Sequence, residues 1–363
     1  MKHLLFLCMV IQLIVLNAKS QITEIVLLNE TEIERVKELV KISPEVKYFR
    51  DSIINEVKKT WKATPQPVQV IHYEGLLPNH PDRMKTVESL ADADRMVNLI
   101  YASYFSEIPG LPQKAKQLIL AWATTYLPDG NPINENKLTA FFWGFQLFKN
   151  YFSAKEQKTV TDWLSKIAAA EQSRAQTPNN NWEAKRLKII GTAGCILDDE
   201  SLKNLAAEGF KKYIATAYFA DGTSNDLQQR DALHYHIGGI IPCLSIFINL
   251  SKYDNRFDLY RFTTESGSSI EKSVEYVIPY ATGEKQRKEW ANSKVALDRE
   301  RAAAGVAEYQ PGKLFEPQEA FSMLQWACYY NPDWFPIFEN EEKPQYRSTW
   351  IGFLNSPLVR QNE

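Results

Sequence analysis

A tyrosine flanked by two histidines marks the segment from Arg230 to His236, which reads Arg-Asp-Ala-Leu-His-Tyr-His. A tyrosine can act as both base and acid when nearby cations or hydrogen-bond donors lower its pKa from about 10. Arg230 and His234 stand four residues apart, so they share one face of a helix. The segment therefore offers Tyr235 as an acid–base residue. The alternative is a buried tyrosine with two structural histidines at the start of a helix.

A run of three asparagines, Asn179, Asn180 and Asn181, precedes Trp182 immediately before a predicted helix. Asparagine is common at such positions because it caps backbone amides and tolerates turn geometry. A side-chain amide is also a good hydrogen-bond donor to a carboxylate. The run is therefore either a helix cap or part of a site for an acidic group.

Two loops gather basic and aromatic side chains, one around residues 72–85 and the other around residues 280–288. Glycine and proline punctuate the first loop, and a glycine turn opens the second. Both loops are candidates for contact with an acidic substrate, and the alternative is ordinary solvated charge. The candidate binding residues in them are His72, Tyr73, Arg83, Tyr280, Lys285 and Arg287.

The rest of the chain reads as helix after helix, separated by short turns rich in proline, glycine and asparagine. Thr31 and Glu34 have the spacing of a capping box ahead of the first helix, and residues 67–73 are the best short strand candidate. Residues 139–152 and 231–250 are apolar nearly all round, which predicts interior helices. We expect an all-α protein built from paired helices. The other predicted helices are 88–106, 112–126, 155–171, 182–197, 200–218, 268–277 and 316–330.

Composition describes an ordinary globular protein, with 44% hydrophobic and 24% charged residues. The formal net charge of −2 argues against a nucleic-acid-binding protein, which needs a basic face. It still permits a polyanionic saccharide as partner if the basic residues gather in one groove. The spacing of the cysteines and histidines does not suggest a metal site, and we expect no cofactor.

The N-terminus has the pattern of a secretory signal peptide over residues 1–20. Lys2 precedes an apolar run from residue 4 to residue 16, and Ala18 and Ser20 are the small residues that a signal peptidase reads. The run is too short to cross a bilayer, which takes about 20 residues. We expect a secreted or periplasmic protein without a membrane anchor after cleavage. No linker divides residues 21–363, which predicts a single catalytic domain.

Two motifs together resemble the alginate lyase family of helical-toroid polysaccharide lyases. The first is Asn-Asn followed closely by Trp; the second, about 50 residues later, is Asp-Gly-Thr with Arg-x-Ala-Leu-x-Tyr-His. Residues 72–78 with Asp92, and residues 279–285, extend the resemblance over most of the chain. The resemblance implies an (α/α) toroid of helical hairpins. The matching motif residues are Asn179, Asn180, Trp182, Asp221, Gly222, Arg230, Ala232, Leu233, Tyr235 and His236.

The family resemblance also implies a reaction, the β-elimination of an acidic polysaccharide. In this reaction a base removes the weakly acidic C5 proton of a uronate, and an acid protonates the leaving C4-linked oxygen. Donors that neutralise the uronate carboxylate stabilise the transition state. By resemblance Tyr235 is base and acid, while Asn180 or a neighbouring asparagine, Arg230 and His236 hold the carboxylate. Trp182, His234 and the two loops would bind the polymer.

Two departures from the family pattern bear on the substrate. Asn181 stands where the family has histidine, and Gln228 stands where it has arginine, with Arg230 two residues later. A single tyrosine can serve when the C5 hydrogen and the C4 oxygen leave from one side, as in β-1,4-linked mannuronate or glucuronate. This predicts mannuronate-rich alginate or glucuronan as substrate. The alternatives are a helical-toroid glycoside hydrolase, with Asp226 and Asp231 as one possible carboxylate pair, and a saccharide-binding protein with weakened activity.

Overall fold

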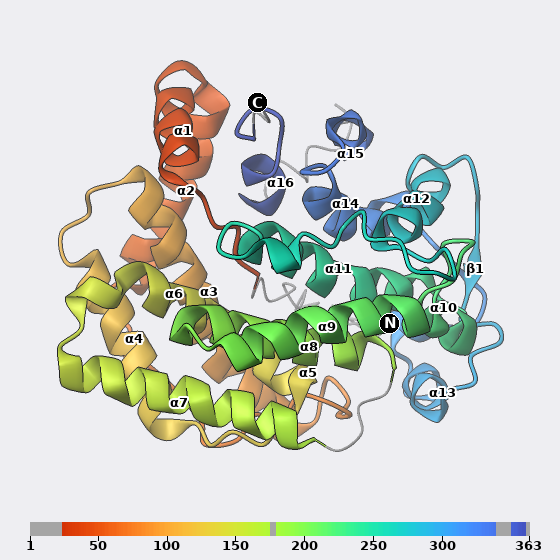
Figure 1. The fold of residues 1–363 in the computed structure, drawn as a ribbon, viewed down its shortest axis with the longest axis horizontal. Coiled ribbons are helices and arrows are strands. Elements are labelled where there is room, and N and C mark those ends of the chain that lie inside the picture. Colours follow the sequence, from red (N-terminus) through yellow and green to blue (C-terminus); the bar gives the residue numbers. More distant parts are fainter. Residues whose placement is uncertain (1–23, 175–178, 339–349, 361–363) are drawn as a thin grey trace, which may run out of the picture.

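The computed structural model describes residues 24–174, 179–338 and 350–360, and in this part of the chain helices dominate (Figure 1). The predicted signal peptide lies outside the described residues. The α-helices are α1 (Glu30–Ile42), α2 (Pro44–Thr60), α3 (Pro81–Phe105), α4 (Leu111–Thr125), α5 (Pro132–Glu135), α6 (Thr139–Phe148), α7 (Ala154–Ser173), α8 (Asn181–Leu197), α9 (Glu200–Ala217), α10 (Asn225–Arg230), α11 (Leu233–Leu250), α12 (Ile270–Ala281), α13 (Ala296–Ala303), α14 (Phe321–Ala327), α15 (Phe335–Phe338) and α16 (Trp350–Leu354).

Short 3₁₀ helices and one two-stranded sheet complete the described structure. Strands β1 (Lys288–Glu289) and β2 (Lys313–Leu314) pair antiparallel. The predicted strand at 67–73 is wrong, because these residues form no strand. The 3₁₀ helices are η1 (Asn136–Leu138), η2 (Lys149–Tyr151), η3 (Asn255–Phe257), η4 (Ala307–Tyr309), η5 (Pro317–Ala320) and η6 (Pro332–Trp334).

Helix starts are set by local capping chemistry. α1 has a reciprocal capping box between Asn29 and Glu32, so the predicted box at Thr31 is two residues too late. α7 starts with the same device, formed by Ser153 and Glu156. In each case one side chain bonds to a free backbone amide of the first helical turn, which would otherwise lack a partner.

The helices pack in successive neighbouring pairs around a continuous apolar core. α8 lies at the centre and contacts α7, α9 and α11, while α6 contacts α3 and α4. α11 is long and apolar enough to cross a membrane by length and composition, but 83% of it is buried inside the protein, which identifies a core helix. The predicted interior position of α6 and α11 is thus confirmed. The arrangement is the expected all-α toroid of helical hairpins.

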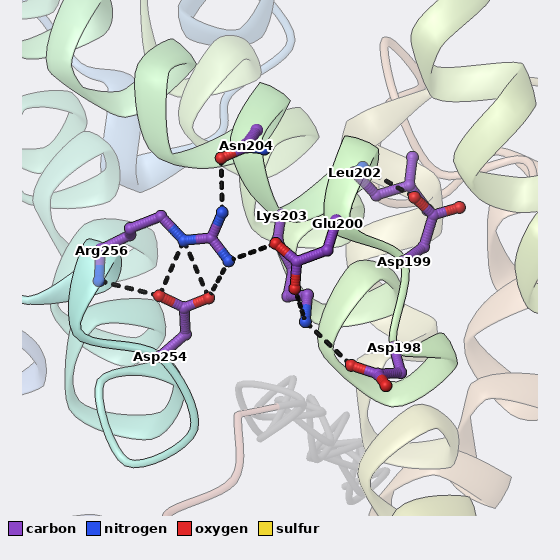
Figure 2. Close-up of polar contacts among 8 residues, drawn as sticks. All are labelled: Asp198, Asp199, Glu200, Leu202, Lys203, Asn204, Asp254 and Arg256. Atoms are coloured by element: carbon purple, nitrogen blue, oxygen red, sulfur yellow. Dashed lines mark hydrogen bonds and ion pairs between the residues drawn. The ribbon is translucent and has the colours of Figure 1, made fainter.

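A polar network ties the α8–α9 turn to the end of α11 (Figure 2). Arg256 donates to Asn204 (2.5 Å) and Glu200 (2.8 Å), and it also pairs with Asp254. Lys203 bridges Glu200 (2.5 Å) and Asp198 (2.9 Å) across the turn. α8 spans 17 residues, or about 25 Å at 1.5 Å per residue. The network therefore holds one end of α8 while Asn181 begins the other.

A buried pair of carboxyl groups consists of Glu135 at the end of α5 and Glu171 in α7. Both residues are fully buried, and one oxygen of Glu135 accepts from the Tyr126 hydroxyl (3.1 Å) and the Asp129 amide (2.9 Å). Burial and the neighbouring Glu135 raise the pKa of Glu171 to about 9. Glu171 is therefore protonated at neutral pH, although neither of its oxygens has a hydrogen-bond partner within the described structure. The turn before α5 is bonded to the end of α7 by Arg174, which donates to the Gly130 carbonyl (2.6 Å).

Residues 288–314, which we call the β1–β2 segment, fold back against the start of α11. The segment contains both strands, α13 and η4, and Figure 1 shows α13 and β1 beside α10. Backbone bonds fasten it: the Trp290 amide donates to the Asp231 carbonyl (2.9 Å), and the Lys294 amide donates to the Gln229 carbonyl (2.8 Å). The Glu289 carboxylate accepts from the Leu233 amide, one of the free amides at the start of α11.

Candidate active site

Tyr235 lies in the first turn of α11, and only 9% of it is exposed. Its hydroxyl accepts a hydrogen bond from Arg301 Nη1 at 2.8 Å and lies 3.2 Å from the Tyr309 hydroxyl. Arg301 Nη1 also donates to the Tyr309 oxygen at 2.9 Å. The three side chains form one cluster, in which two members come from the β1–β2 segment.

Arg230 covers the face of the Tyr235 ring. Its guanidinium carbon lies 3.4 Å from the ring centroid, close enough for a cation–π contact. The same guanidinium makes a two-point ion pair with Asp298, at 3.0 and 2.6 Å. Because Asp298 already compensates the charge of Arg230, the contact positions Tyr235 and leaves less charge for a substrate than the sequence led us to expect.

Trp290 supports the cluster from the other side. Its ring lies edge to face against Tyr235, with centroids 5.7 Å apart, and 4.7 Å from the ring of Tyr309. His234 packs against Trp290 and pairs with Glu308 at 3.1 Å. Trp290 has a φ of +64°, which is an unusual backbone conformation for a bulky residue and costs on the order of 1–3 kcal/mol. Such strain is typical of functional sites.

His236 is fully buried and has both ring nitrogens in use. Nε2 lies 3.1 Å from the Ser273 carbonyl, and Nδ1 lies 2.7 Å from the Ser224 hydroxyl. Burial lowers the pKa of His236 to about 4, so the ring is neutral at pH 7. Nε2 therefore donates to the carbonyl while Nδ1 accepts from Ser224. This placement does not favour the predicted contact between His236 and a substrate carboxylate.

The three asparagines occupy different environments. Asn180 caps α8 by accepting from the Trp182 amide (3.0 Å), and the exposed Asn179 accepts from the Thr216 hydroxyl (3.1 Å). Asn181 is buried, its backbone amide donates to Asp226 (2.9 Å), and its side-chain oxygen has no hydrogen-bond partner within the described structure. Asn180 and Asn179 thus serve local structure. Asn181 is the asparagine with side-chain bonding capacity to spare.

Lys185 lies one helical turn after Asn181 on α8, which places both on one face. Burial lowers the pKa of Lys185 to about 8, while the nearby Asp226 partly opposes the shift. Burial also raises the pKa of Asp226 to about 6, although the Asn181 amide, Arg230 and Lys185 act in the opposite direction. Asp226 therefore interacts electrostatically with Asn181 and Lys185 on α8 and also with Arg230 beside Tyr235.

The loop before α3 contributes Tyr73 to the same basic region. The Arg83 guanidinium carbon and the Lys137 ammonium lie 4.3 and 3.7 Å from the Tyr73 ring centroid. Burial opposes ionisation of Tyr73, but the charges of Lys137, Arg83 and Arg301 outweigh it and lower its pKa. Because Arg301 acts on both Tyr73 and Tyr235, the loop and the Tyr235 cluster face one site.

The remaining predicted binding residues make no hydrogen bond, ion pair or ring contact with the Tyr235 cluster in the described structure. His72 is exposed, and Trp182 packs against Arg174, whose guanidinium carbon is 4.9 Å from the ring. Lys285 is exposed, and Tyr280 packs on Tyr276 with centroids 5.8 Å apart.

Arg287 pairs with Asp231, a residue with a φ of +51° whose carbonyl anchors the β1–β2 segment. It therefore acts through the backbone beside Tyr235.

Sequence reasoning missed the residues that the β1–β2 segment brings to Tyr235, and two lysines. The residues of the β1–β2 segment lie 55–74 positions after Tyr235, and the two lysines lie on or just before helices that are predicted from their apolar residues. Charged positions such as 298–301 have the pattern of a solvated helix. Only the fold shows that they converge. The missed residues are Lys137, Lys185, Trp290, Asp298, Arg301 and Tyr309.

Comparison with known proteins identifies the class. The family model described as alginate lyase matches residues 49–287. An alginate lyase from Bacteroides ovatus superimposes with a TM-score of 0.64 at 17% identity, covering 92% of this chain and 97% of that one. Alginate lyase A1-III complexed with a tetrasaccharide gives a TM-score of 0.52 at 16% identity, covering 82% and 95%. A search of curated proteins gave no match.

The fold and the family match define a helical-toroid polysaccharide lyase, as the sequence motifs predicted. The chain belongs to the alginate lyase family. The family match ends at residue 287, directly before the β1–β2 segment. The residues that complete the Tyr235 cluster are therefore outside the matched region.

Proposed function

We propose that the protein cleaves a β-1,4-linked polyuronate by β-elimination, with Tyr235 as both base and acid. The observation that carries the proposal is the Tyr235 hydroxyl, which accepts a hydrogen bond from Arg301 at 2.8 Å while the partly buried Arg230 lies over the tyrosine ring. The tetrasaccharide complex of alginate lyase A1-III supports an acidic polysaccharide as ligand. The products are a new reducing end and a 4,5-unsaturated uronate.

Neutralisation of the uronate carboxylate falls to Asn181 and Lys185 in this proposal. The unpartnered side-chain atom of Asn181 in the described structure is an oxygen, which only accepts hydrogen bonds, so the carboxylate contact falls to the nitrogen of the same amide group. Lys185 follows one turn later on the same helix face. Asn180 is occupied as a cap, Arg230 is paired with Asp298, and His236 is bonded on both nitrogens. An amide and an ammonium near the carboxylate stabilise the charge that develops when the C5 proton leaves.

The substrate that we propose is mannuronate-rich alginate or glucuronan. In these polymers the C5 hydrogen and the C4 oxygen leave from the same side, so one tyrosine can make both proton transfers. Assays on polymannuronate, glucuronan and polyguluronate would measure unsaturated product by ultraviolet absorbance. We expect turnover of the first two, and a marked preference for polyguluronate would contradict the proposal.

Replacing Tyr235 with phenylalanine tests the catalytic assignment. Tyr235→Phe removes only the hydroxyl, so it should reduce turnover to background, by at least about 10³-fold, while leaving binding of the polymer nearly unchanged. Polymer binding by calorimetry and the folded state by circular dichroism are the controls. Turnover within tenfold of wild type would exclude Tyr235 as the acid–base residue.

The glycoside hydrolase alternative receives less support. Asp226 accepts from the Asn181 amide at 2.9 Å, and Asp231 is engaged by Arg287 and Asn292. A hydrolase needs a carboxyl group for general acid catalysis and a second one beside the scissile bond. Reducing ends that appear without a matching ultraviolet signal would favour hydrolysis. Polymer binding without turnover would favour the binding-protein alternative.

We also propose export through a signal peptide at residues 1–20, followed by a single catalytic domain. The apolar run and the small residues at its end support this proposal. Mass determination of the mature protein from its native host would show a start near residue 21, whereas a mature chain beginning at Met1 would contradict it.

A further inference from the structure

The Tyr235 hydroxyl is held by two side chains from the β1–β2 segment. Arg301 Nη1 lies 2.8 Å from the Tyr235 oxygen and 2.9 Å from the Tyr309 oxygen, and the two phenol oxygens are 3.2 Å apart. Trp290 packs on both tyrosine rings and fixes their relative position. Tyr235, Arg301 and Tyr309 thus form a polar cluster that packs against the Trp290 ring.

The direction of each hydrogen bond follows from the chemistry of the partners. A guanidinium only donates, so Tyr235 accepts from Arg301. Burial raises the pKa of Tyr309 above its ordinary value, and the neighbouring Tyr235 adds to the effect. Tyr309 therefore keeps its proton and donates it to the Tyr235 oxygen whenever that oxygen carries the negative charge.

Two cations contact Tyr235, and they differ in how closely a carboxylate compensates them. Arg230 lies over the ring face but is compensated by Asp298 at 2.6 Å. Arg301 has no carboxylate within ion-pair distance among the described residues, and its partners are the two phenols. An opposite charge at this distance stabilises an ionised group strongly. Asp298 acts on Arg301 only from beyond ion-pair distance, so the guanidinium directs its positive charge at the Tyr235 oxygen without a close carboxylate partner.

We propose that Arg301 and Tyr309 act together as a two-donor cradle that holds the Tyr235 oxygen and stabilises the negative charge on it when it acts as the base. This inference rests on the proposed elimination. The phenolate takes the C5 proton, and the C–H electron pair forms the C4–C5 double bond as the C4–O bond breaks. The departing oxygen then takes the proton from the Tyr235 hydroxyl, and the phenolate is restored. Arg301 and Tyr309 are positioning residues, because they act through Tyr235.

The cradle also supports the proposed stereochemistry. The Tyr309 and Tyr235 hydroxyls are 3.2 Å apart, so both would approach a sugar ring from the same side. Tyr309 therefore does not supply a proton donor on the opposite face. It donates to the Tyr235 oxygen instead of acting as a second acid.

The pH dependence of kcat/KM tests the cradle through Arg301→Met, Arg301→Lys and Tyr309→Phe. Without the guanidinium, the rising limb of the pH profile should move up by about 1–2 pH units. Activity near neutral pH should fall on the order of 10- to 100-fold and partly recover at higher pH. Arg301→Lys should lie between Arg301→Met and wild type. Tyr309→Phe, which removes one neutral donor, should lose on the order of 3- to 10-fold with a smaller shift.

Arg299→Met is the matched control, since Arg299 is exposed on the same helix α13 and contacts Ser293 instead of either tyrosine. It should keep the wild-type profile. An equal loss at every pH in both Arg301 variants would overturn the cradle and indicate only a structural role. Failure of the proposed function would look different, because Tyr235→Phe would then retain turnover or the wild type would form no unsaturated product.

Discussion

At the residue scale, the polar side chains of the site differ in whether they are already hydrogen-bonded or ion-paired within the protein. Asn180, Arg230 and His236 all match the family motifs, yet each is bonded within the protein. Asn181 and Lys185 stand on one face of α8 near Asp226. The position that departs from the family pattern, Asn181, is therefore the one we expect to touch the substrate.

A paired substitution separates the roles of two neighbouring asparagines. Asn180→Ala removes the α8 cap and should lower the free energy of unfolding by about 1 kcal/mol, with little change in kcat. Asn181→Ala removes the side-chain amide whose nitrogen would donate to the carboxylate, and it should lower kcat on the order of 10- to 100-fold, with little loss of stability. Thermal unfolding and steady-state kinetics of both variants measure the two effects. The opposite pattern would assign the carboxylate contact to Asn180.

At the element scale, polar contacts between neighbouring elements, some buried and some exposed, hold the helices in place. Arg174 bonds the end of α7 to the turn before α5, next to the buried Glu135 and Glu171, and the network around Arg256 joins α9 to the segment after α11. The β1–β2 segment is fastened to α10 and α11 by backbone bonds and by Glu289. These contacts determine where the ends of α8 and α11 lie, and hence the distance between Asn181 and Tyr235.

The Glu171 carboxyl group predicts a pH-dependent stability. Its folded-state pKa is raised from 4.5 to about 9, so its stabilising contribution is complete below pH 4.5 and is lost as the pH rises through 9. Glu171→Gln imitates the protonated acid and cannot ionise. The variant should melt on the order of a few degrees above wild type at pH 8 and show a flatter dependence on pH.

Calorimetry from pH 5 to pH 9 measures this effect. A Glu171→Gln protein that loses stability at pH 8 would indicate that the carboxylate form is the stable one. Activity at pH 7 serves as the control, because Glu171 makes no contact with the Tyr235 cluster in the described structure.

At the scale of the whole molecule, a chain with a net charge of −2 brings cations from several elements toward one site. Lys137, Lys185 and Arg301 come from η1, α8 and α13, and electrostatic contacts through Tyr73 and Asp226 connect them with the Tyr235 cluster. Such a distribution attracts a polyanion although the protein itself is slightly acidic.

Salt dependence tests this distribution. KM for a polyuronate should rise with ionic strength, because the Debye length falls from about 10 Å at 0.1 M to about 3 Å at 1 M. Lys185→Met should raise KM at low salt and weaken its dependence on salt. Arg256→Met removes a cation near the far end of α8 and should leave the salt dependence unchanged. A KM independent of salt in the wild type would contradict electrostatic binding.

The sequence by itself determined the helical class, the interior position of α6 and α11, and the family through the Asn-Asn-x-Trp and Arg-to-His motifs. These features depend on local periodicity and short spacing, which a linear sequence displays directly. It also identified Tyr235 and the region of the three asparagines as candidates.

Only the tertiary structure decided which candidates have free bonding groups and which distant residues join them. Asn180 and Asn181 are adjacent in sequence, yet one caps a helix and the other has an unpartnered oxygen in the described structure. Arg301 and Tyr309 reach Tyr235 because the β1–β2 segment folds back over 66 and 74 positions. Burial, charge compensation and long-range contact arise from packing, so residue types and spacing along the chain do not specify them.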